Sequence, residues 1–148
     1  MNQSTAEDKN KVDGFKWYNL ADDINLEDYI GFVYKITHLP TKKYYIGKKF
    51  FWKILKRPPL KGKKNKRHEK QSSDWREYWG SSEELLKDIQ KYGKESFKRE
   101  ILFLAKSKWD CAYEEARLQM ESRVLFDPNC YNGIINIRLK KFLKKTVE

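Results

Sequence analysis

Apolar and polar residues alternate most clearly in the first third of the chain. Residues 31–38, GFVYKITH, are rich in β-branched and aromatic side chains, and residues 44–49, YYIGKK, repeat this character after a short connection that contains Pro40. Two extended runs around a Pro-containing turn predict a β-hairpin.

Residues 80–93, GSSEELLKDIQKYG, carry the clearest helical pattern in the sequence. Ser81 with Glu84 forms a capping box, and Gly93 supplies a C-terminal stop. The apolar residues that share one face of this predicted helix are Leu85, Leu86, Ile89 and Tyr92.

The next pattern is an almost continuous apolar run at 96–105, SFKREILFLA, which predicts a third strand. A second amphipathic helix is predicted from Asp110 as N-cap to the DPN sequence at 127–129. The apolar positions that share one stripe of this helix are Tyr113, Ala116, Met120 and Val124. A short fourth strand is possible from residue 131.

Two further segments are predicted from local composition. Residues 50–56, FFWKILK, predict a short helix that ends before Pro58, because a residue followed by proline avoids the helical region. Residues 57–73 have few apolar side chains and predict a basic loop. The order of elements predicts a small mixed α/β (α+β) domain with three or four strands.

These elements divide the chain into three parts. Residues 1–30 are expected to form a polar tail followed by an arm that packs on the domain. Residues 31–137 are expected to form the domain itself, with a basic insertion at 48–73. Residues 138–148 are expected to form a basic C-terminal tail.

Charge adds a strong constraint on the function. The chain has 148 residues, the size of a single domain, and a formal net charge of +11. Residues 48–70 hold eleven Lys and Arg against one Glu, while residues 1–30 hold three basic and seven acidic residues. This local excess indicates a polyanionic partner, most often a nucleic acid. A solvated basic loop is the alternative, but Phe50, Phe51 and Trp52 within the run favour binding.

Little else in the composition points to chemistry. Cys111 and Cys130 lack CxxC spacing and predict reduced thiols in a cytoplasmic protein, and no apolar run approaches the ~20 residues that cross a bilayer. His38 ends the first predicted strand and is expected to be structural. His68 lies in the basic run and is expected to be solvated.

On the second predicted helix, Glu121 is the candidate catalytic carboxylate. It lies about 80° round the helix from Tyr113, at the edge of the predicted buried face, from which it could reach a cleft. The alternative is a surface ion pair with Arg117, worth a few tenths of a kcal/mol. Helix geometry alone favours the surface pair.

Four landmarks resemble the GIY-YIG nucleases. Tyr34 in FVY and Tyr45 in YIG, with ten residues between them, resemble the two halves of the family signature. Residues 80–102 are similar to the helix-then-strand segment of the phage-type free-standing homing endonucleases. Glu121 and Asn132, in CYNG, match later motifs, so the resemblance covers about residues 31–137.

The resemblance implies a small three-stranded antiparallel sheet flanked by helices, and cleavage of a DNA phosphodiester with one divalent metal ion, Mg²⁺ or another such as Mn²⁺. It implies that Glu121 holds the metal and that Tyr34 or Tyr45 contacts or deprotonates the attacking water. An unperturbed tyrosine has a pKa of about 10, so a base role needs a nearby cation such as Lys48. The alternative is cross-strand packing of the two rings.

The sequence departs from the family pattern in three places, one of which is the long basic insertion between YIG and the GSS helix. Phe32 replaces the usual first glycine, and Leu55 stands where the family carries an arginine that steadies the scissile phosphate. Arg57 is the preferred substitute, with Arg67 and Arg76 as alternatives.

The insertion is expected to bind double-stranded DNA through phosphate contacts, with strong salt dependence and modest sequence specificity. The expected DNA-binding residues are Lys48, Lys49, Lys63, Lys64, Lys66, Arg67 and Arg76, with Gly47, Tyr78 and Asn132 in supporting roles. A monomer without membrane association is favoured.

The leading hypothesis is therefore a GIY-YIG endonuclease that nicks or cuts DNA with a divalent metal. A basic DNA- or RNA-binding protein that kept the fold and lost cleavage is the alternative, because the arginine is uncertain. A ribosomal-type RNA-binding module is a weaker third hypothesis that rests on charge alone.

Overall fold

The computed structural model describes residues 12–142. The strands are β1 (Trp17–Tyr18), β2 (Gly31–His38), β3 (Tyr44–Phe50), β4 (Trp52–Arg57), β5 (Arg67–Ser72) and β6 (Phe97–Ala105), and the α-helices are α2 (Glu83–Tyr92) and α3 (Lys108–Glu121). The predicted 1–12 tail falls almost wholly outside the described residues, as does the end of the predicted C-terminal tail.

The main sheet has the strand order β1-β6-β2-β3. Strand β2 is antiparallel to both β3 and β6, so the predicted hairpin and the three-stranded antiparallel sheet are confirmed. The two-residue strand β1 adds a parallel edge beside β6. Strand β3 forms the other edge, and this position makes its outer backbone groups available to the site.

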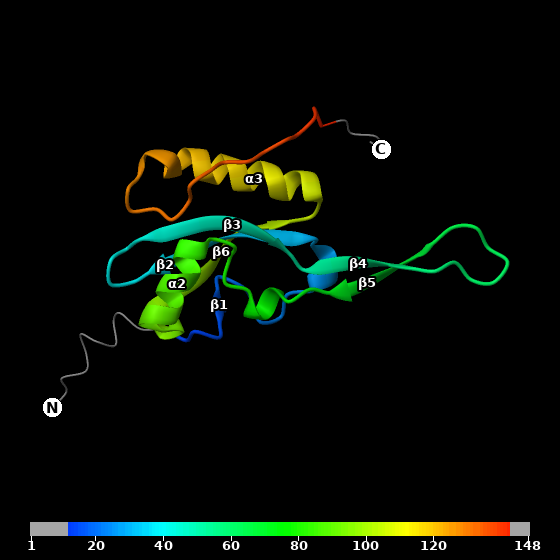
Figure 1. Cartoon of the computed structure of the whole chain (residues 1–148), viewed down its shortest axis with the longest axis horizontal. Coiled ribbons are helices and arrows are strands. Elements are labelled where there is room, and N and C mark those ends of the chain that lie inside the picture. The colour runs from blue at the N-terminus through cyan, green and yellow to red at the C-terminus, as the bar shows by residue number, and fades with distance from the viewer. Residues whose placement is uncertain (1–11, 143–148) are drawn as a thin grey trace.

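Helices cover both faces of the sheet (Figure 1). On one face, α2 packs its Leu85 and Ile89 against a core that includes Phe32 and Tyr34 of β2. On the other face, α3 packs against a second core that includes Val33. Because successive strand residues point to opposite faces and both faces are covered, the FVY run is buried throughout.

Helix α2 lies where it was predicted and ends at Gly93 as expected, but its N-cap and part of its buried face differ from the prediction. Ser82, not Ser81, is the N-cap, and its Oγ accepts a hydrogen bond from the backbone N–H of Leu85. Leu86 and Tyr92, which were expected on the buried face, are exposed. The buried stripe is therefore narrower than the run of apolar residues.

The predicted buried stripe of α3 is wrong in part. Tyr113 and Met120 are 45% and 56% exposed, while Cys111, Ala116 and Gln119 are buried against the sheet. The inner face carries polar side chains that find partners on β3, so hydrophobicity alone identifies the wrong stripe. The helix also begins earlier than predicted, at Lys108, with Ser107 as N-cap.

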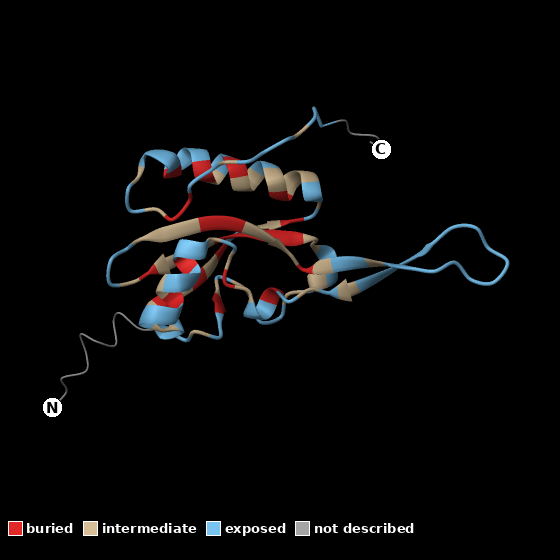
Figure 2. Ribbon diagram, in the orientation of Figure 1, coloured by how far each residue is buried: buried red, intermediate tan, exposed pale blue. Residues whose placement is uncertain are grey.

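Strands β4 and β5 form a separate two-stranded sheet, joined by a loop at 58–66. We call residues 52–72 the basic hairpin. The predicted helix at 50–56 is wrong, because Phe51 is buried in the core and the following β-branched and aromatic residues pair with β5. The hairpin projects from the body of the protein, and most of it is exposed (Figures 1 and 2).

The arm at 14–30 lies against the sheet through Trp17, which is 6% exposed. After α3 the chain makes an isolated bridge between Cys130 and Tyr44 in place of the possible fourth strand. Within residues 12–142, no helix combines the length and the apolar character needed to cross a bilayer.

Candidate active site

The two signature tyrosines lie next to each other on the α2 side of the sheet. Tyr34 of β2 pairs in register with Gly47 of β3, and the ring centroids of Tyr34 and Tyr45 are 6.2 Å apart. A Cβ atom at position 47 would lie 2.6 Å from the Tyr34 hydroxyl and 2.8 Å from the Tyr45 ring. The glycine of YIG therefore provides the space in which the two phenols meet.

Tyr78 is a third phenol in this cluster. Its ring is nearly perpendicular to that of Tyr34, with 6.0 Å between the centroids. The sequence placed Tyr78 in a supporting role, and the structure brings it to the cluster.

Buried Arg99 of β6 holds the Tyr78 segment in place. Its Nη1 donates to the carbonyl of Tyr78 at 2.7 Å and to that of Arg76 at 3.0 Å, and its guanidinium lies between the rings of Trp17 and Trp79. Burial lowers the pKa of Arg99 to about 10, so it is still charged at neutral pH. Sequence reasoning missed this residue, because an isolated arginine on a strand gives no motif.

Asn132 closes part of the free edge of β3. Its Oδ1 accepts from the backbone N–H of Ile46, and its Nδ2 donates to the Ile46 carbonyl, both at 2.9 Å. Gln119 of α3 donates to the same carbonyl at 2.9 Å. The asparagine thus behaves as a short piece of neighbouring strand, which satisfies a buried edge and fixes the position of β3 beside α3.

Beside this edge lies a cleft of about 370 Å³, which we call the edge cleft. Side chains from both faces of the sheet line it, because β3 is the last strand and side chains can meet around its edge. The lining residues used below are Tyr45, Lys48, Ser81, Glu115, Gln119 and Asn132.

Glu115 is the carboxylate in the edge cleft. Its side chain is 16% exposed, and its Oε1 lies 3.4 Å from Nζ of Lys48. Burial raises the pKa of Glu115, while the charge and hydrogen bonds of Lys48 act in the opposite direction. A half-buried acid with one loose cationic partner can accept a further cation.

Glu121, the carboxylate that the resemblance gave as metal ligand, does not line this cleft. Its side chain is 66% exposed and forms a 2.8 Å ion pair with Arg117. It lies six positions after Glu115, a rotation of about 240° round the helix, which places the two acids on different faces. The surface pair that helix geometry favoured is the one that forms.

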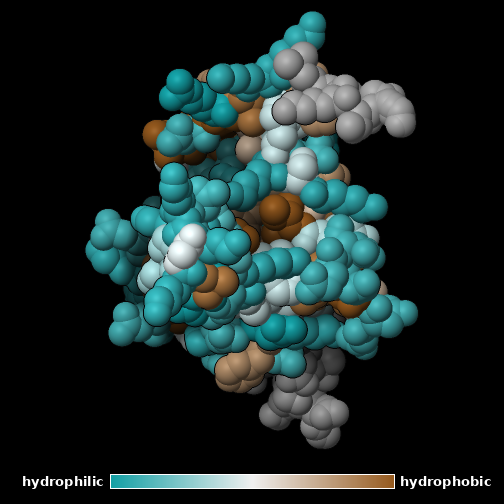
Figure 3. All heavy atoms as spheres, turned by 90° about the vertical axis from the view of Figure 1, so that its right-hand side faces the viewer, coloured by the Kyte–Doolittle hydropathy of each residue, from teal (hydrophilic) through white to brown (hydrophobic). Residues whose placement is uncertain are grey.

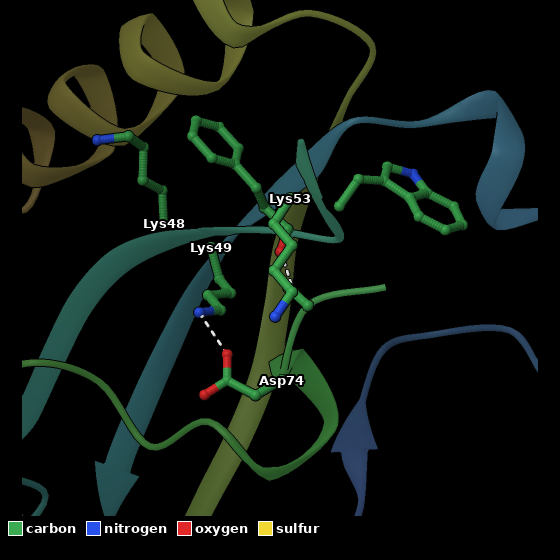
Figure 4. Close-up of a pocket in the computed structure, with 7 residues that line it drawn as sticks. Lys48, Lys49, Lys53 and Asp74 are labelled. Atoms are coloured by element: carbon green, nitrogen blue, oxygen red, sulfur yellow. Dashed lines mark hydrogen bonds and ion pairs between the residues drawn. The ribbon is translucent and has the colours of Figure 1, made fainter. Parts of the chain in front are cut away.

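Lys48 and Lys49 leave β3 on opposite sides (Figure 4). Lys48 points toward α3 and Glu115, whereas Lys49 pairs with Asp74 at 2.7 Å and lies 4.2 Å from the centre of the Tyr78 ring. Both lysines, with Lys53 of the hairpin, line a second cleft of about 690 Å³, which we call the lysine cleft. Lys48 lines both clefts and so joins them.

The three candidate arginines lie elsewhere. Arg57 is on the basic hairpin and pairs with Glu69 at 3.1 Å, and Arg67 donates to the carbonyl of Pro58. Arg76 is exposed and stacks on Trp75. None of these three lines the edge cleft or the lysine cleft, whose nearest cations in residues 12–142 are lysines.

The phenols are not tuned toward phenolate, contrary to the expectation from nearby cations. Burial raises the pKa of Tyr34 well above its usual value, and the neighbouring phenols raise it further. Burial also raises the pKa of Tyr45, against a smaller opposing effect of its hydrogen bond with Ser81. Both groups are therefore protonated at neutral pH.

The donor set fits a hydrated hard cation. Magnesium prefers oxygen ligands and commonly keeps several waters, so one carboxylate and an adjacent cleft suffice. Glu115 supplies that carboxylate. The described residues contain no group of three or more His, Cys, Asp or Glu side chains arranged as a preformed metal cage.

The remaining predicted DNA-binding lysines, Lys63, Lys64 and Lys66, are exposed in the loop of the basic hairpin. The face of the molecule on the hairpin side is mostly hydrophilic, with hydrophobic residues in separate patches (Figure 3).

The antiparallel sheet, with its two tyrosines meeting over a glycine, defines a GIY-YIG domain. The family model described as "Putative endonuclease segE, GIY-YIG domain" matches residues 14–135, and the chain belongs to this family of endonuclease domains, whose substrate is nucleic acid. No curated protein and no solved structure matches the chain significantly.

Proposed function

We propose that the chain is a metal-dependent endonuclease that hydrolyses phosphodiester bonds of double-stranded DNA, with the edge cleft as its active site. The observation that carries the proposal is the convergence of Glu115, Lys48 and Tyr45 on one cleft. An acid, a cation and a hydroxyl group are the groups that phosphodiester hydrolysis requires.

Glu115 takes the role of metal ligand that the resemblance gave to Glu121. A magnesium or manganese ion held there would polarise the scissile phosphate and stabilise its developing negative charge. Gln119, one turn later on α3, keeps its amide on the Ile46 carbonyl and thereby fixes the helix that carries Glu115.

Tyr45 is the signature phenol that lines the cleft, whereas Tyr34 is 1% exposed and lies under Gly47. We therefore assign to the Tyr45 hydroxyl the role of contacting the attacking water. As a protonated phenol it orients the water by hydrogen bonding. Tyr34 and Tyr78 support its ring from behind.

Lys48, which lines the edge cleft, takes the place of the family arginine at the scissile phosphate, and Lys49, which lines only the lysine cleft, is assigned to the adjacent DNA backbone. An ammonium group holds a phosphate as a point charge and lacks the two-pronged geometry of a guanidinium. Arg57, on the hairpin, is assigned to DNA binding. The homing role, the phage origin, the monomeric state and the cytoplasmic location that were predicted from the sequence stay predictions.

Plasmid cleavage tests the proposal. Supercoiled plasmid incubated with the full chain and magnesium is expected to become nicked or linear, and to stay supercoiled when the metal is chelated. Restoring activity with manganese after chelation would identify a divalent requirement. Cleavage that persists with excess chelator would contradict the metal role of Glu115.

A non-catalytic DNA- or RNA-binding protein is the second candidate, because lysines, and not an arginine, line both clefts. This candidate predicts that the protein shifts DNA in a gel but leaves it intact with magnesium, manganese, cobalt and calcium. Comparison of shifted duplex DNA with shifted duplex RNA of the same sequence would then identify the nucleic acid.

A further inference from the structure

The basic hairpin has two chemically different faces. In an antiparallel pair, residues directly opposite each other point to the same side, and successive pairs alternate. One face carries the pairs Trp52–Ser72, Ile54–Lys70 and Lys56–His68, and the other carries Lys53–Gln71, Leu55–Glu69 and Arg57–Arg67. We call them the tryptophan face and the arginine face.

The tryptophan face turns toward an acidic part of the protein. Trp52 donates from its indole N–H to the carbonyl of Tyr29, and Lys70 lies over the Trp52 ring while pairing with Glu27 at 2.7 Å. Asp28 lines the same surface. A polyanion approaching this side meets carboxylates, and the lysine closest to the body is already paired.

The arginine face begins at the lysine cleft. Lys53 lines the lysine cleft together with Lys48 and Lys49, and its ammonium points toward Asp74 (Figure 4). Farther along the hairpin, this face carries Arg57 and Arg67 at opposite register positions; Arg57 forms an ion pair with Glu69 of the same face at 3.1 Å, whereas Arg67 donates to the Pro58 carbonyl. The cations on this side therefore lie in two groups, Lys48, Lys49 and Lys53 at the lysine cleft and Arg57 and Arg67 farther along the hairpin, with the Leu55–Glu69 pair between them.

The hairpin is not part of the core. Every residue from 56 to 70 is exposed, and hydrogen bonds of Phe51 with Ile30 and Ser73 anchor only its base. An isolated two-stranded ribbon is marginally stable in water, so a partner surface would stabilise it. The major groove of DNA admits a two-stranded ribbon of this width. The right-handed twist of the ribbon turns the arginine face gradually about the hairpin axis.

We infer that double-stranded DNA lies against the arginine face of the basic hairpin, and that the tryptophan face stays turned toward the acidic arm and away from DNA. The inference rests on the proposed function, because it extends the DNA path from the proposed active site. Strands of six residues at ~3.3 Å per residue reach ~20 Å, about six base pairs to one side of the cleavage site.

Two double variants with the same loss of charge test the inference. Lys53→Gln with Arg67→Gln removes two positive charges from the arginine face, and Lys56→Gln with Lys70→Gln removes two from the tryptophan face. Lys53 and Lys56 are matched, because both are exposed lysines of β4 on opposite faces. Affinity for a duplex oligonucleotide is measured over a range of salt concentrations, and thermal denaturation establishes that both variants are folded.

The arginine-face variant is expected to bind roughly tenfold more weakly and to lose about two units from the slope of log affinity against log salt. The tryptophan-face variant is expected to stay within about twofold of the unchanged protein. Equal losses in both variants, or a larger loss on the tryptophan face, would overturn the inference.

Failure of the proposed function gives a different result. Suppose that the unchanged protein binds duplex DNA but never cleaves it, while the arginine-face variant binds more weakly than the tryptophan-face variant. This result would refute the nuclease proposal and support the inference. Cleavage by both variants at the unchanged rate and affinity would refute the inference and leave the nuclease proposal standing.

Discussion

Tyr34 lies directly opposite Gly47, and its hydroxyl occupies the space that any side chain at position 47 would enter. The glycine of the signature is therefore required by packing between two strands. Its φ angle does not lie in the left-handed region, so the constraint comes from the neighbouring phenols.

Gly47→Ala should displace the Tyr34 and Tyr45 rings. Overpacking in a close-packed region costs about 1–3 kcal/mol, and we expect that loss in the free energy of unfolding, measured by urea denaturation. Gly133→Ala is the control, because a Cβ there meets no atom within 4 Å. Equal stability of both variants would show that the rings move aside without cost.

Glu115→Gln should abolish cleavage and leave DNA binding in place. Loss of the carboxylate removes the proposed metal ligand, and we expect a rate at least roughly 100-fold lower in a plasmid assay with magnesium. Glu121→Gln removes the same charge from the same helix and should stay within about twofold, since that side chain pairs with Arg117 at the surface. The reverse order of effects would restore the original assignment of the metal to Glu121.

Asn132 and Gln119 should be coupled in their effect on stability. Both amides donate to the carbonyl of Ile46, so either single alanine variant leaves that carbonyl one partner. The double alanine variant leaves it none, and a buried unsatisfied group costs about 1–3 kcal/mol. The double variant should therefore lose more than the sum of the single losses in a double-mutant cycle of unfolding free energies. Additive losses would indicate that water or another donor replaces the amides.

His38 should make the fold less stable in mild acid. Its ring is 4% exposed between Tyr92 and Phe97, and this burial lowers its pKa, while Asp88 acts in the opposite direction. The unfolded chain binds a proton near pH 6.5, before the folded protein does. The contribution of neutral His38 to the free energy of unfolding is therefore fully present above about pH 6.5. It falls as the pH decreases toward the lowered pKa of the folded protein.

The measurement is the urea midpoint at pH 7.5 and pH 5.5, for the unchanged protein and for His38→Gln. The variant should lose less stability over this range, because it lacks the titrating ring. An equal pH dependence in the two proteins would show that groups other than His38 cause the effect.

The local patterns predicted the parts of the fold that short-range interactions determine. The hairpin tyrosines, helix α2 with its glycine stop, and strand β6 were predicted because propensity, capping and burial act there on neighbouring residues. The basic hairpin was misread, because FFWKILK has both helical spacing and β-forming residues, and only pairing of β4 with β5 decides between them.

The sequence predicted several residues that line the candidate cleft, but not the carboxylate that the structure places there. Tyr45, Lys48 and Asn132 lie where the sequence expected a cleft, whereas Glu115 was overlooked in favour of Glu121. The error follows from the rotation of α3: its inner face contains Glu115 and Gln119, which hydrogen-bond to β3, so the face that packs on the sheet is not the most hydrophobic one.

The sequence by itself determined the class of domain, the pair of tyrosines with the glycine between them, and the concentration of positive charge in one segment. Tertiary structure alone decided which acid faces the cleft, that lysines stand where an arginine was expected, and that the basic segment is a ribbon with two faces. The physical reason is the sequence separation of the interacting residues: strand and helix patterns depend on residues a few positions apart. The rotation of a helix and the pairing of two strands depend on partners that the chain brings together only when it folds.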